Sequence, residues 1–242
     1  MKVRKSTRIV ALGVTLLLLL SLLPTSAIAA ANMTVVNNAV AAKNVILMIG
    51  DGMGLDHVKA AEMTNLLSIA DTDAVTTVTT RSNDAEVTDS AAAATAMSCG
   101  IKTNNSYVGL DPNGNQVMTM TEYAQSLGMR TGLVVTEILP HATPAGFSAH
   151  EIGRWNYDNI AKDQLVSEID VMFGGGSSYF DSLNSSMDRV GYEYYTSFCA
   201  VPDTLGDSKI LGAFGSGAIP QVDSSNQPTG YPTLSAMTSR AL

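Results

Sequence analysis

Asp51 lies in a short glycine-rich segment, Gly50-Asp51-Gly52-Met53-Gly54, directly after the apolar run Val45–Ile49. Glycines let the backbone turn sharply and approach a ligand, which would leave the carboxylate exposed at the end of a strand. A carboxylate at such a place is a suitable hard ligand for Zn²⁺ or Mg²⁺. The alternative is that Asp51 only caps the turn into the next helix. The segment lacks the Gly-Lys-Ser/Thr of a phosphate-binding P-loop.

Ser90 stands near the start of an alanine-rich run, Asp-Ser-Ala-Ala-Ala-Ala-Thr-Ala at residues 89–96. A run without Pro or Gly predicts a helix, and a hydroxyl at its start would lie among free backbone N–H groups at the positive end of the helix dipole. This location suits both a bound phosphate and an oxygen nucleophile. The alternative is an ordinary helix N-cap formed by Asp89 and its neighbours.

A third group consists of His141, Thr143 and Arg154. His141 and Thr143 alternate along one extended segment after an apolar run, so both side chains could face the same site. Arg154 near a helix-dipole anion site could hold a phosphate through two parallel hydrogen bonds. The alternative is a loop histidine and a surface arginine.

These side chains need a framework, and the apolar pattern predicts an α/β fold. Continuous apolar runs predict buried, mostly parallel strands at residues 45–49, 131–136 and 169–173. Helices are expected over residues 55–70, 88–99 and 118–127, the last ending at Gly128. This alternation is typical of a mostly parallel sheet flanked by helices, in which ligands bind at the carboxyl ends of the strands.

The composition of the chain changes beyond about Gly206. Residues 209–214 are a further candidate strand, and residues 215–232 are rich in Gly, Ser, Pro, Asn and Gln, which predicts an exposed loop. Pro232 and Thr233 then give a helix-start signal, and the sequence stops ten residues later. We interpret this unfinished helix as the mark of a domain that is interrupted at its C-terminus.

Residues 1–30 have the three parts of a secretory signal peptide. Lys2, Arg4, Lys5 and Arg8 form the basic region, an apolar stretch follows to Leu23, and cleavage is expected near Ala29/Ala30. The protein is therefore expected to be exported to the periplasm, cell surface or medium, with residues 31–42 as a flexible leader. The alternative is an uncleaved membrane anchor, but the apolar stretch is short for a bilayer span.

The net charge of −8 becomes −12 without the signal peptide, because 10 basic residues then face 22 acidic ones. Such an acidic chain argues against nucleic acid as a partner, since phosphate backbones select basic surfaces. The two cysteines, Cys99 and Cys199, are too few for a disulfide framework or a structural zinc cluster. Export would allow them to pair, and the sequence leaves that pairing open.

The segments 44–54, 87–100 and 141–150, together with Arg154, closely resemble the alkaline phosphatase family. The run at residues 89–96 is similar to the nucleophile motif of that family. The resemblance extends through residues 169–176 and 232–242 and covers only about the N-terminal half of a family member. Residues 43–242 are therefore expected to be the N-terminal part of an alkaline phosphatase-like α/β domain.

The resemblance implies a role for each matching residue. Ser90 would be the nucleophile that becomes a transient phosphoserine, and Arg154 would bind phosphate oxygens with Asp89 orienting it. Asp51 would bridge one zinc and the magnesium, with Ser90 and Thr143 as further metal ligands and His141 beside them. The family implies two Zn²⁺ and one Mg²⁺, phosphomonoester substrates, and inorganic phosphate as product. A homodimer is an assembly that the resemblance allows.

The three histidines, His57, His141 and His150, are too few for the complete metal site that the family implies. The remaining ligands would be Asp-x-x-x-His, Asp-His and one more His, and none of these patterns stands at a matching position. Asp56-His57 is interpreted as a helix-start pair and His150 as a residue that shapes the loop before Arg154. We therefore expect this chain to hold the nucleophile and the phosphate clamp but to lack most of the metal ligands.

The sequence is compatible with two functions. The first is a metal-dependent phosphomonoesterase of which this chain is a fragment with doubtful activity of its own. The second is a non-catalytic, secreted phosphate- or metal-binding fragment. A sulfatase or phosphodiesterase of the wider superfamily is disfavoured by the runs at residues 89–96 and 141–145.

Overall fold

The computed structural model describes residues 42–64, 76–220 and 230–242. Residues 1–48 and 49–242 form two separate compact units. The described part of the first unit, residues 42–48, contains neither helix nor strand. The expected signal peptide (1–30) and all but the last residue of the expected leader (31–42) lie outside the described residues.

The strand expected at Val45–Ile49 is not present, so this prediction is wrong. The run has no regular secondary structure, and its side chains are exposed, with Met48 at 81%. An apolar run becomes a strand only where a neighbour accepts and donates its backbone hydrogen bonds. No strand of the described residues pairs with this run.

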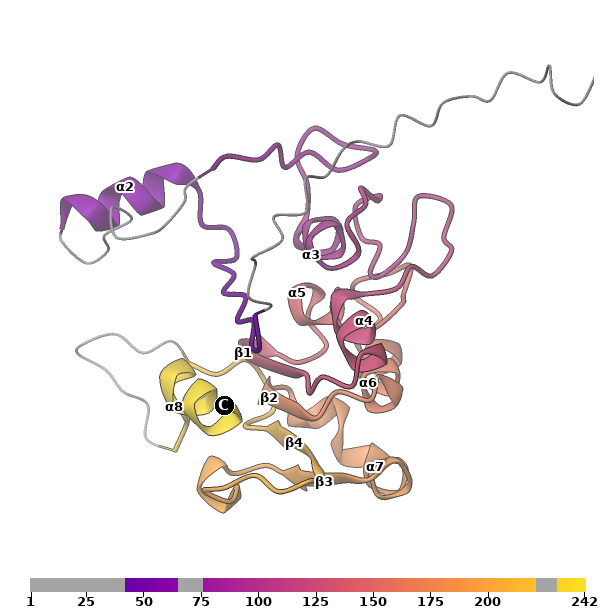
Figure 1. Cartoon of the computed structure of the whole chain (residues 1–242), viewed down its shortest axis with the longest axis vertical. Coiled ribbons are helices and arrows are strands. Elements are labelled where there is room, and N and C mark those ends of the chain that lie inside the picture. The colour runs from indigo at the N-terminus through magenta and orange to yellow at the C-terminus, as the bar shows by residue number, and fades with distance from the viewer. Residues whose placement is uncertain (1–41, 65–75, 221–229) are drawn as a thin grey trace, which may run out of the picture. The chain divides into compact units, whose positions relative to one another are not determined.

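Four parallel strands form the sheet of the second unit, in the order β1-β2-β4-β3 (Figure 1). Their bounds are β1 Gly132–Ile138, β2 Val171–Gly175, β3 Tyr192–Tyr195 and β4 Lys209–Ala213. Leu133 is in register with Met172, and Met172 with Leu211. The expectation of a mostly parallel sheet with helices is confirmed. The strand β3 was not predicted, because its Tyr-Glu-Tyr-Tyr sequence lacks a continuous apolar run.

Seven α-helices occur in the described residues: α2 Leu55–Met63, α3 Ser90–Cys99, α4 Met120–Ser126, α5 Ala142–Ala145, α6 Tyr157–Val166, α7 Asn184–Val190 and α8 Leu234–Ala241. Short 3₁₀ turns are η1 Ser177–Tyr179, η2 Asp181–Leu183 and η3 Phe198–Ala200. Helices α2, α3, α4 and α8 lie where the sequence predicts them, although residues 65–70 of the first prediction are outside the described part. Helices α5, α6 and α7 were missed. None of the described helices is long and apolar enough to cross a membrane.

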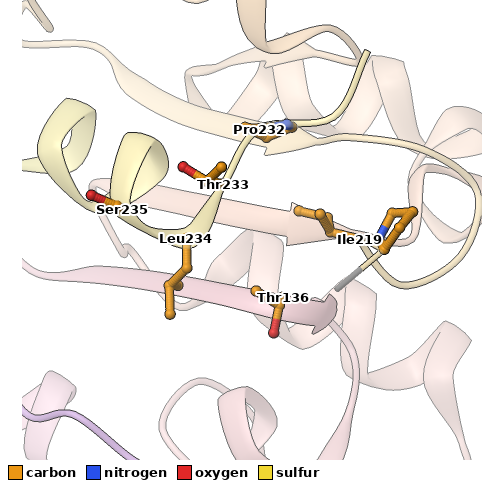
Figure 2. A pocket seen from close by; sticks show the side chains of 7 residues that line it. Thr136, Ile219, Pro232, Thr233, Leu234 and Ser235 are labelled. Carbon is orange, nitrogen blue, oxygen red and sulfur yellow. The ribbon is translucent and has the colours of Figure 1, made fainter. Parts of the chain in front are cut away.

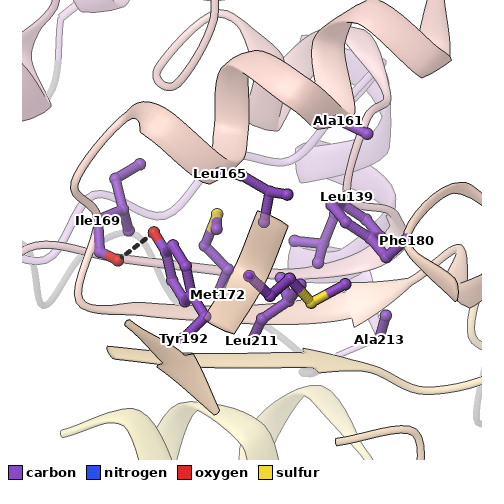
Figure 3. Packing of buried hydrophobic residues seen from close by; sticks show 10 residues of the cluster. Leu139, Ala161, Leu165, Ile169, Met172, Phe180, Tyr192, Leu211 and Ala213 are labelled. Carbon is purple, nitrogen blue, oxygen red and sulfur yellow. Dashed lines mark hydrogen bonds between the residues drawn. The ribbon is translucent and has the colours of Figure 1, made fainter. Parts of the chain in front are cut away.

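The sheet is covered on both faces, as the alternation of neighbouring strand residues requires. Met172 and Leu211 point to one face and pack with Leu165 of α6 and Met187 of α7 (Figure 3). Their neighbours Phe173 and Ile210 point to the other face and pack with Met237 of α8. In the first cluster the hydroxyl of Tyr192 donates to the carbonyl of Ile169 at 2.6 Å, so the buried phenol keeps a partner.

Candidate functional site

Helix α3 begins with a side-chain cap that fixes the position of Ser90. Asp89 precedes the helix, and its Oδ1 accepts a hydrogen bond from the backbone N–H of Ala92 at 2.9 Å. Ser90 is the first residue of the helix and is half-buried. Its hydroxyl therefore lies at the positive end of the helix dipole, as the sequence indicated.

Small residues on α3 allow the next helix of the site to approach closely. Ala91, Ala92 and Ala94 are buried. A Cβ on Gly146, which directly follows α5, would lie 2.7 Å from the Cβ of Ala94. A side chain at Gly146, or a larger one at Ala94, would push α5, and with it Thr143, away from Ser90. The alanine-rich run is therefore a packing surface as well as a helix signal.

Asp51 joins the three segments that the sequence singled out. Its Oδ1 accepts a hydrogen bond from Ser90 Oγ at 3.0 Å, and its Oδ2 accepts one from Thr143 Oγ1 at 2.8 Å. The two partners are 39 and 92 positions away in the sequence. Asp51 itself lies in an exposed turn in which Gly52 adopts a φ of 71°. One carboxylate and two hydroxyls thus share one place.

Arg154 is linked to the start of α3 through Asp89. Its Nη1 donates to Asp89 Oδ2 at 3.0 Å, and the two side chains are 10% and 22% exposed. The Nε of Arg154 is buried without a hydrogen-bond partner. A buried donor without a partner is costly, so this guanidinium has unused capacity for an anion.

The loop at residues 104–109 holds Asp89 and Arg154 together, and no motif in the sequence points to it. The backbone N–H of Ser106 donates to Asp89 Oδ2 at 3.0 Å, and its carbonyl accepts from the backbone N–H of Arg154 at 3.0 Å. Ser106 adopts a φ of 73°, a left-handed conformation that is uncommon outside glycine. Asn105 Oδ1 accepts from the N–H of Asp89 at 3.0 Å. An Asn-Ser pair is ordinary in loops, so only the fold reveals its function here.

His141 stands directly before α5, two residues from Thr143. Its half-buried ring lies 6.5 Å from the ring of Trp155 and 6.3 Å from that of Tyr157. Burial lowers the pKa of His141, and the charge of Arg154 acts in the same direction, against Glu137 and Asp51. This shift favours the neutral form of the imidazole.

The other two histidines have local partners. His150 joins the carbonyl of Gly109, at 2.7 Å from Nδ1, to a carboxylate oxygen of Glu122, at 3.1 Å from Nε2. His57 is exposed at the start of α2, where its Nδ1 accepts from the N–H of Gly54 at 3.3 Å. Within the described residues, neither histidine forms a hydrogen bond to Asp51, Ser90 or Thr143.

The oxygen atoms of Asp51, Ser90 and Thr143 are of a kind that binds metal ions, but they are too few to complete a coordination sphere. Carboxylate and hydroxyl oxygens are ligands that Mg²⁺ accepts, and a carboxylate also suits Zn²⁺. Within residues 42–64, 76–220 and 230–242, no three His, Cys, Asp or Glu side chains gather as a metal-binding group. Asp51, Ser90 and Thr143 therefore offer only part of a coordination sphere.

A pocket of about 420 Å³ lies elsewhere, between the end of β1 and the start of α8. Figure 2 shows the lining residues, which include Thr136 of β1, Leu234 and Ser235 of α8, and Ile219. None of the candidate site residues lines this pocket.

The family model for alkaline phosphatase matches residues 42–242. The chain belongs to the alkaline phosphatase family. Its relatives include Alkaline phosphatase 4 of Bacillus subtilis, 36% identical over 221 residues, and Alkaline phosphatase 3 of the same organism, 39% identical over 223 residues. Each alignment covers 83% of this chain and 47% of the relative.

Solved structures of alkaline phosphatases share the fold. A mutant of the enzyme from the Antarctic bacterium TAB5, with Mg bound in its M3 site, matches with a TM-score of 0.69 at 30% identity, over 82% of this chain and 59% of that one. A cold-active alkaline phosphatase from a Shewanella species matches with a TM-score of 0.62 at 34% identity, over 71% of this chain and 46% of that one. The chain thus spans about half the length of the relatives it matches.

Proposed function

We propose that this chain carries the nucleophile and the phosphate clamp of a site that hydrolyses phosphomonoesters through a phosphoserine at Ser90. The observation that carries the proposal is the hydrogen bond from Ser90 Oγ to Asp51, at the start of a helix whose cap, Asp89, also holds Arg154. The match to the alkaline phosphatase family supports the reaction class.

Binding of the phosphate would use two sources of positive charge. The Arg154 guanidinium can bind two phosphate oxygens in parallel, and its buried Nε has no other partner. The N-terminus of α3 adds backbone N–H groups and the helix dipole on the same side. Because Asp89 fixes both elements, the bound phosphorus would lie next to Ser90.

In the transfer step, Ser90 Oγ forms a bond to phosphorus as the bond from phosphorus to the substrate's alcohol oxygen breaks. The proton that Ser90 gives up ends on the released alcohol. Water then cleaves the Ser90–phosphate bond, which releases inorganic phosphate and restores the serine hydroxyl. The hydrogen bond to Asp51 holds the hydroxyl in position for the first step.

Zn²⁺ and Mg²⁺ are the metals that the family resemblance implies, with Asp51, Ser90 and Thr143 as the residues of this chain that would hold them. When bound, such ions supply positive charge that favours the serine alkoxide and the leaving oxygen. The ring of His141, directly before α5, would lie beside Thr143.

The test uses a chimera in which residues 42–242 replace the matching half of Alkaline phosphatase 4 of Bacillus subtilis. The chimera is expected to hydrolyse 4-nitrophenyl phosphate in the presence of Zn²⁺ and Mg²⁺, and Ser90→Ala is expected to abolish that activity. Acid quenching should leave one phosphoryl group on the peptide that contains Ser90. Equal turnover by the Ser90→Ala chimera would contradict the proposal.

A second candidate is a non-catalytic module that binds phosphate or metal. It is favoured by the lack of a three-ligand metal group in the described residues. This candidate predicts that the unmodified chain binds inorganic phosphate, whereas a folded chimera neither turns over substrate nor becomes phosphorylated. Phosphorylation of Ser90 in the chimera would exclude it.

We further propose that the protein acts outside the cytoplasm, after cleavage near Ala29/Ala30. The basic and apolar parts of residues 1–30 support this proposal. Expression in a bacterial host should yield a secreted or periplasmic product whose N-terminal sequence begins near Ala31. A product that keeps residues 1–30 would contradict it.

A further inference from the structure

Trp155, the single tryptophan of the chain, directly follows the phosphate clamp Arg154. Its side chain is 64% exposed, although tryptophan has the largest apolar surface of any residue. The chain therefore leaves a large apolar ring in water beside its candidate anion site.

The ring of Trp155 is held in place on more than one side. The guanidinium carbon of Arg154 lies 4.6 Å from the ring centroid, which is the distance of a cation–π contact. The rings of His141 and Tyr157 meet it edge-to-face, at centroid distances of 6.5 Å and 6.1 Å, each with an interplanar angle of 74°. Tyr157 in turn packs against Tyr179 at 5.4 Å.

These contacts arrange a fixed aromatic surface next to the clamp. Arg154 covers part of one ring face, two aromatic neighbours restrict the rotation of the ring, and the rest of the indole is open to solvent. A restrained and exposed indole binds a planar group at low entropic cost, because little freedom remains to be lost. A phosphate held by Arg154 would carry its ester group close to this ring.

We propose that Trp155 binds the leaving group of the substrate and favours phosphomonoesters of planar aromatic alcohols over those of aliphatic alcohols. This inference rests on the proposed function, because it takes Arg154 as the phosphate clamp. It adds a substrate class to the same site. Stacking on a tryptophan face is tolerant of chemical detail, so simple aryl and heteroaryl phosphates belong to the class.

The contact acts on binding and requires no chemical step, so the unmodified chain of 242 residues can test it. Calorimetry would compare inorganic phosphate, methyl phosphate and phenyl phosphate as ligands. We expect phenyl phosphate to bind about tenfold more tightly than methyl phosphate. Phenyl phosphate should also quench the fluorescence of Trp155 more strongly than methyl phosphate does.

Three variants separate stacking from other functions of the ring. Trp155→Ala and Trp155→Leu should reduce the preference for phenyl over methyl phosphate to about one, whereas Trp155→Phe should retain most of it. The leucine variant keeps apolar bulk without a π face. The exposed position means that all three are expected to fold, and their melting temperatures provide the check.

The possible outcomes distinguish this inference from the proposed function. An unchanged preference in Trp155→Ala, or an equal loss for phenyl phosphate and inorganic phosphate, would overturn the leaving-group contact while the clamp stands. The equal loss would show that Trp155 acts only by positioning Arg154. A chain that binds none of the three ligands would contradict the proposed function and this inference with it.

Discussion

The carboxylate of Asp89 binds two elements at once: Oδ1 caps α3, and Oδ2 accepts a hydrogen bond from Arg154, 65 positions further along the chain. The backbone N–H of Ser106 shares Oδ2 at 3.0 Å. A single side chain therefore sets both the orientation of the helix that carries Ser90 and the position of the guanidinium.

Replacing Asp89 with Ala should lower the free energy of unfolding by roughly 2–5 kcal/mol, since it removes a helix cap and leaves the largely buried Arg154 without its partner. Asp89→Asn should cost less, because asparagine is also a good cap. Urea unfolding measures the free energy of unfolding of both variants. Asp158→Asn, an exposed change in the first turn of α6, is the control and should stay within about 0.5 kcal/mol. Equal stability of Asp89→Ala and this control would contradict the structure.

Protonation of Glu122 should lower the free energy of unfolding of the chain in acid. Burial acts to raise the pKa of Glu122, but the backbone N–H of Thr119 and the contact with His150 outweigh it and lower the pKa below its usual value. The stabilisation is therefore complete above the unfolded-state pKa, about 4.3, and is lost as the pH falls through the lower folded-state value.

Glu122→Gln keeps the capping geometry of α4 without the charge, and it should flatten the decline of the unfolding free energy below about pH 5. Glu86→Gln is the matched control, because the Glu86 side chain is 87% exposed. Urea titrations at several pH values provide the slopes. If Glu122→Gln follows the wild-type slope, the carboxylate does not contribute as described.

Cys99 and Cys199 are both free thiols in this structure. The disulfide between them that the sequence left open is therefore not formed here. Burial raises the pKa of Cys99 to about 11, so almost none of it is thiolate at pH 8. Cys199 is exposed. A thiol reagent at pH 8 should therefore label Cys199 rapidly and Cys99 slowly.

Cys199→Ala should remove the fast phase of labelling, whereas Cys99→Ala should leave it in place. Mass spectrometry of the labelled peptides identifies the site. A protein in which neither thiol reacts until a reductant is added would instead indicate a disulfide.

The meeting of Asp51, Ser90 and Thr143 was expected from the resemblance of their segments to the alkaline phosphatase family, which implies that all three hold metal. Helix α8 was equally clear: Thr233 caps it by accepting from the N–H of Ala236 at 3.0 Å, as the Pro-Thr pair suggested. Such signals are local, so one stretch of sequence carries them.

The parts that sequence did not reveal depend on contacts between distant segments. The run Val45–Ile49 has strand composition but no strand partner in the described residues, so composition alone misled. Ser106 and Trp155 lie in unremarkable polar stretches, and only the fold places one against Asp89 and the other against Arg154. Helix α6 buries Ile160, Ala161 and Leu165 in an otherwise polar segment, which weakened its periodicity.

The affinity of the chain for inorganic phosphate shows whether Arg154 is a phosphate clamp. Calorimetry should detect binding, with Arg154→Ala reducing the affinity by about ten- to a hundredfold and Arg154→Lys by less, because lysine keeps the charge but not the bidentate geometry. Arg130→Ala is the control, since Arg130 pairs with Asp207 on the surface. We expect a loss of phosphate affinity that is confined to the Arg154 variants. Equal affinity of wild type and Arg154→Ala would contradict it.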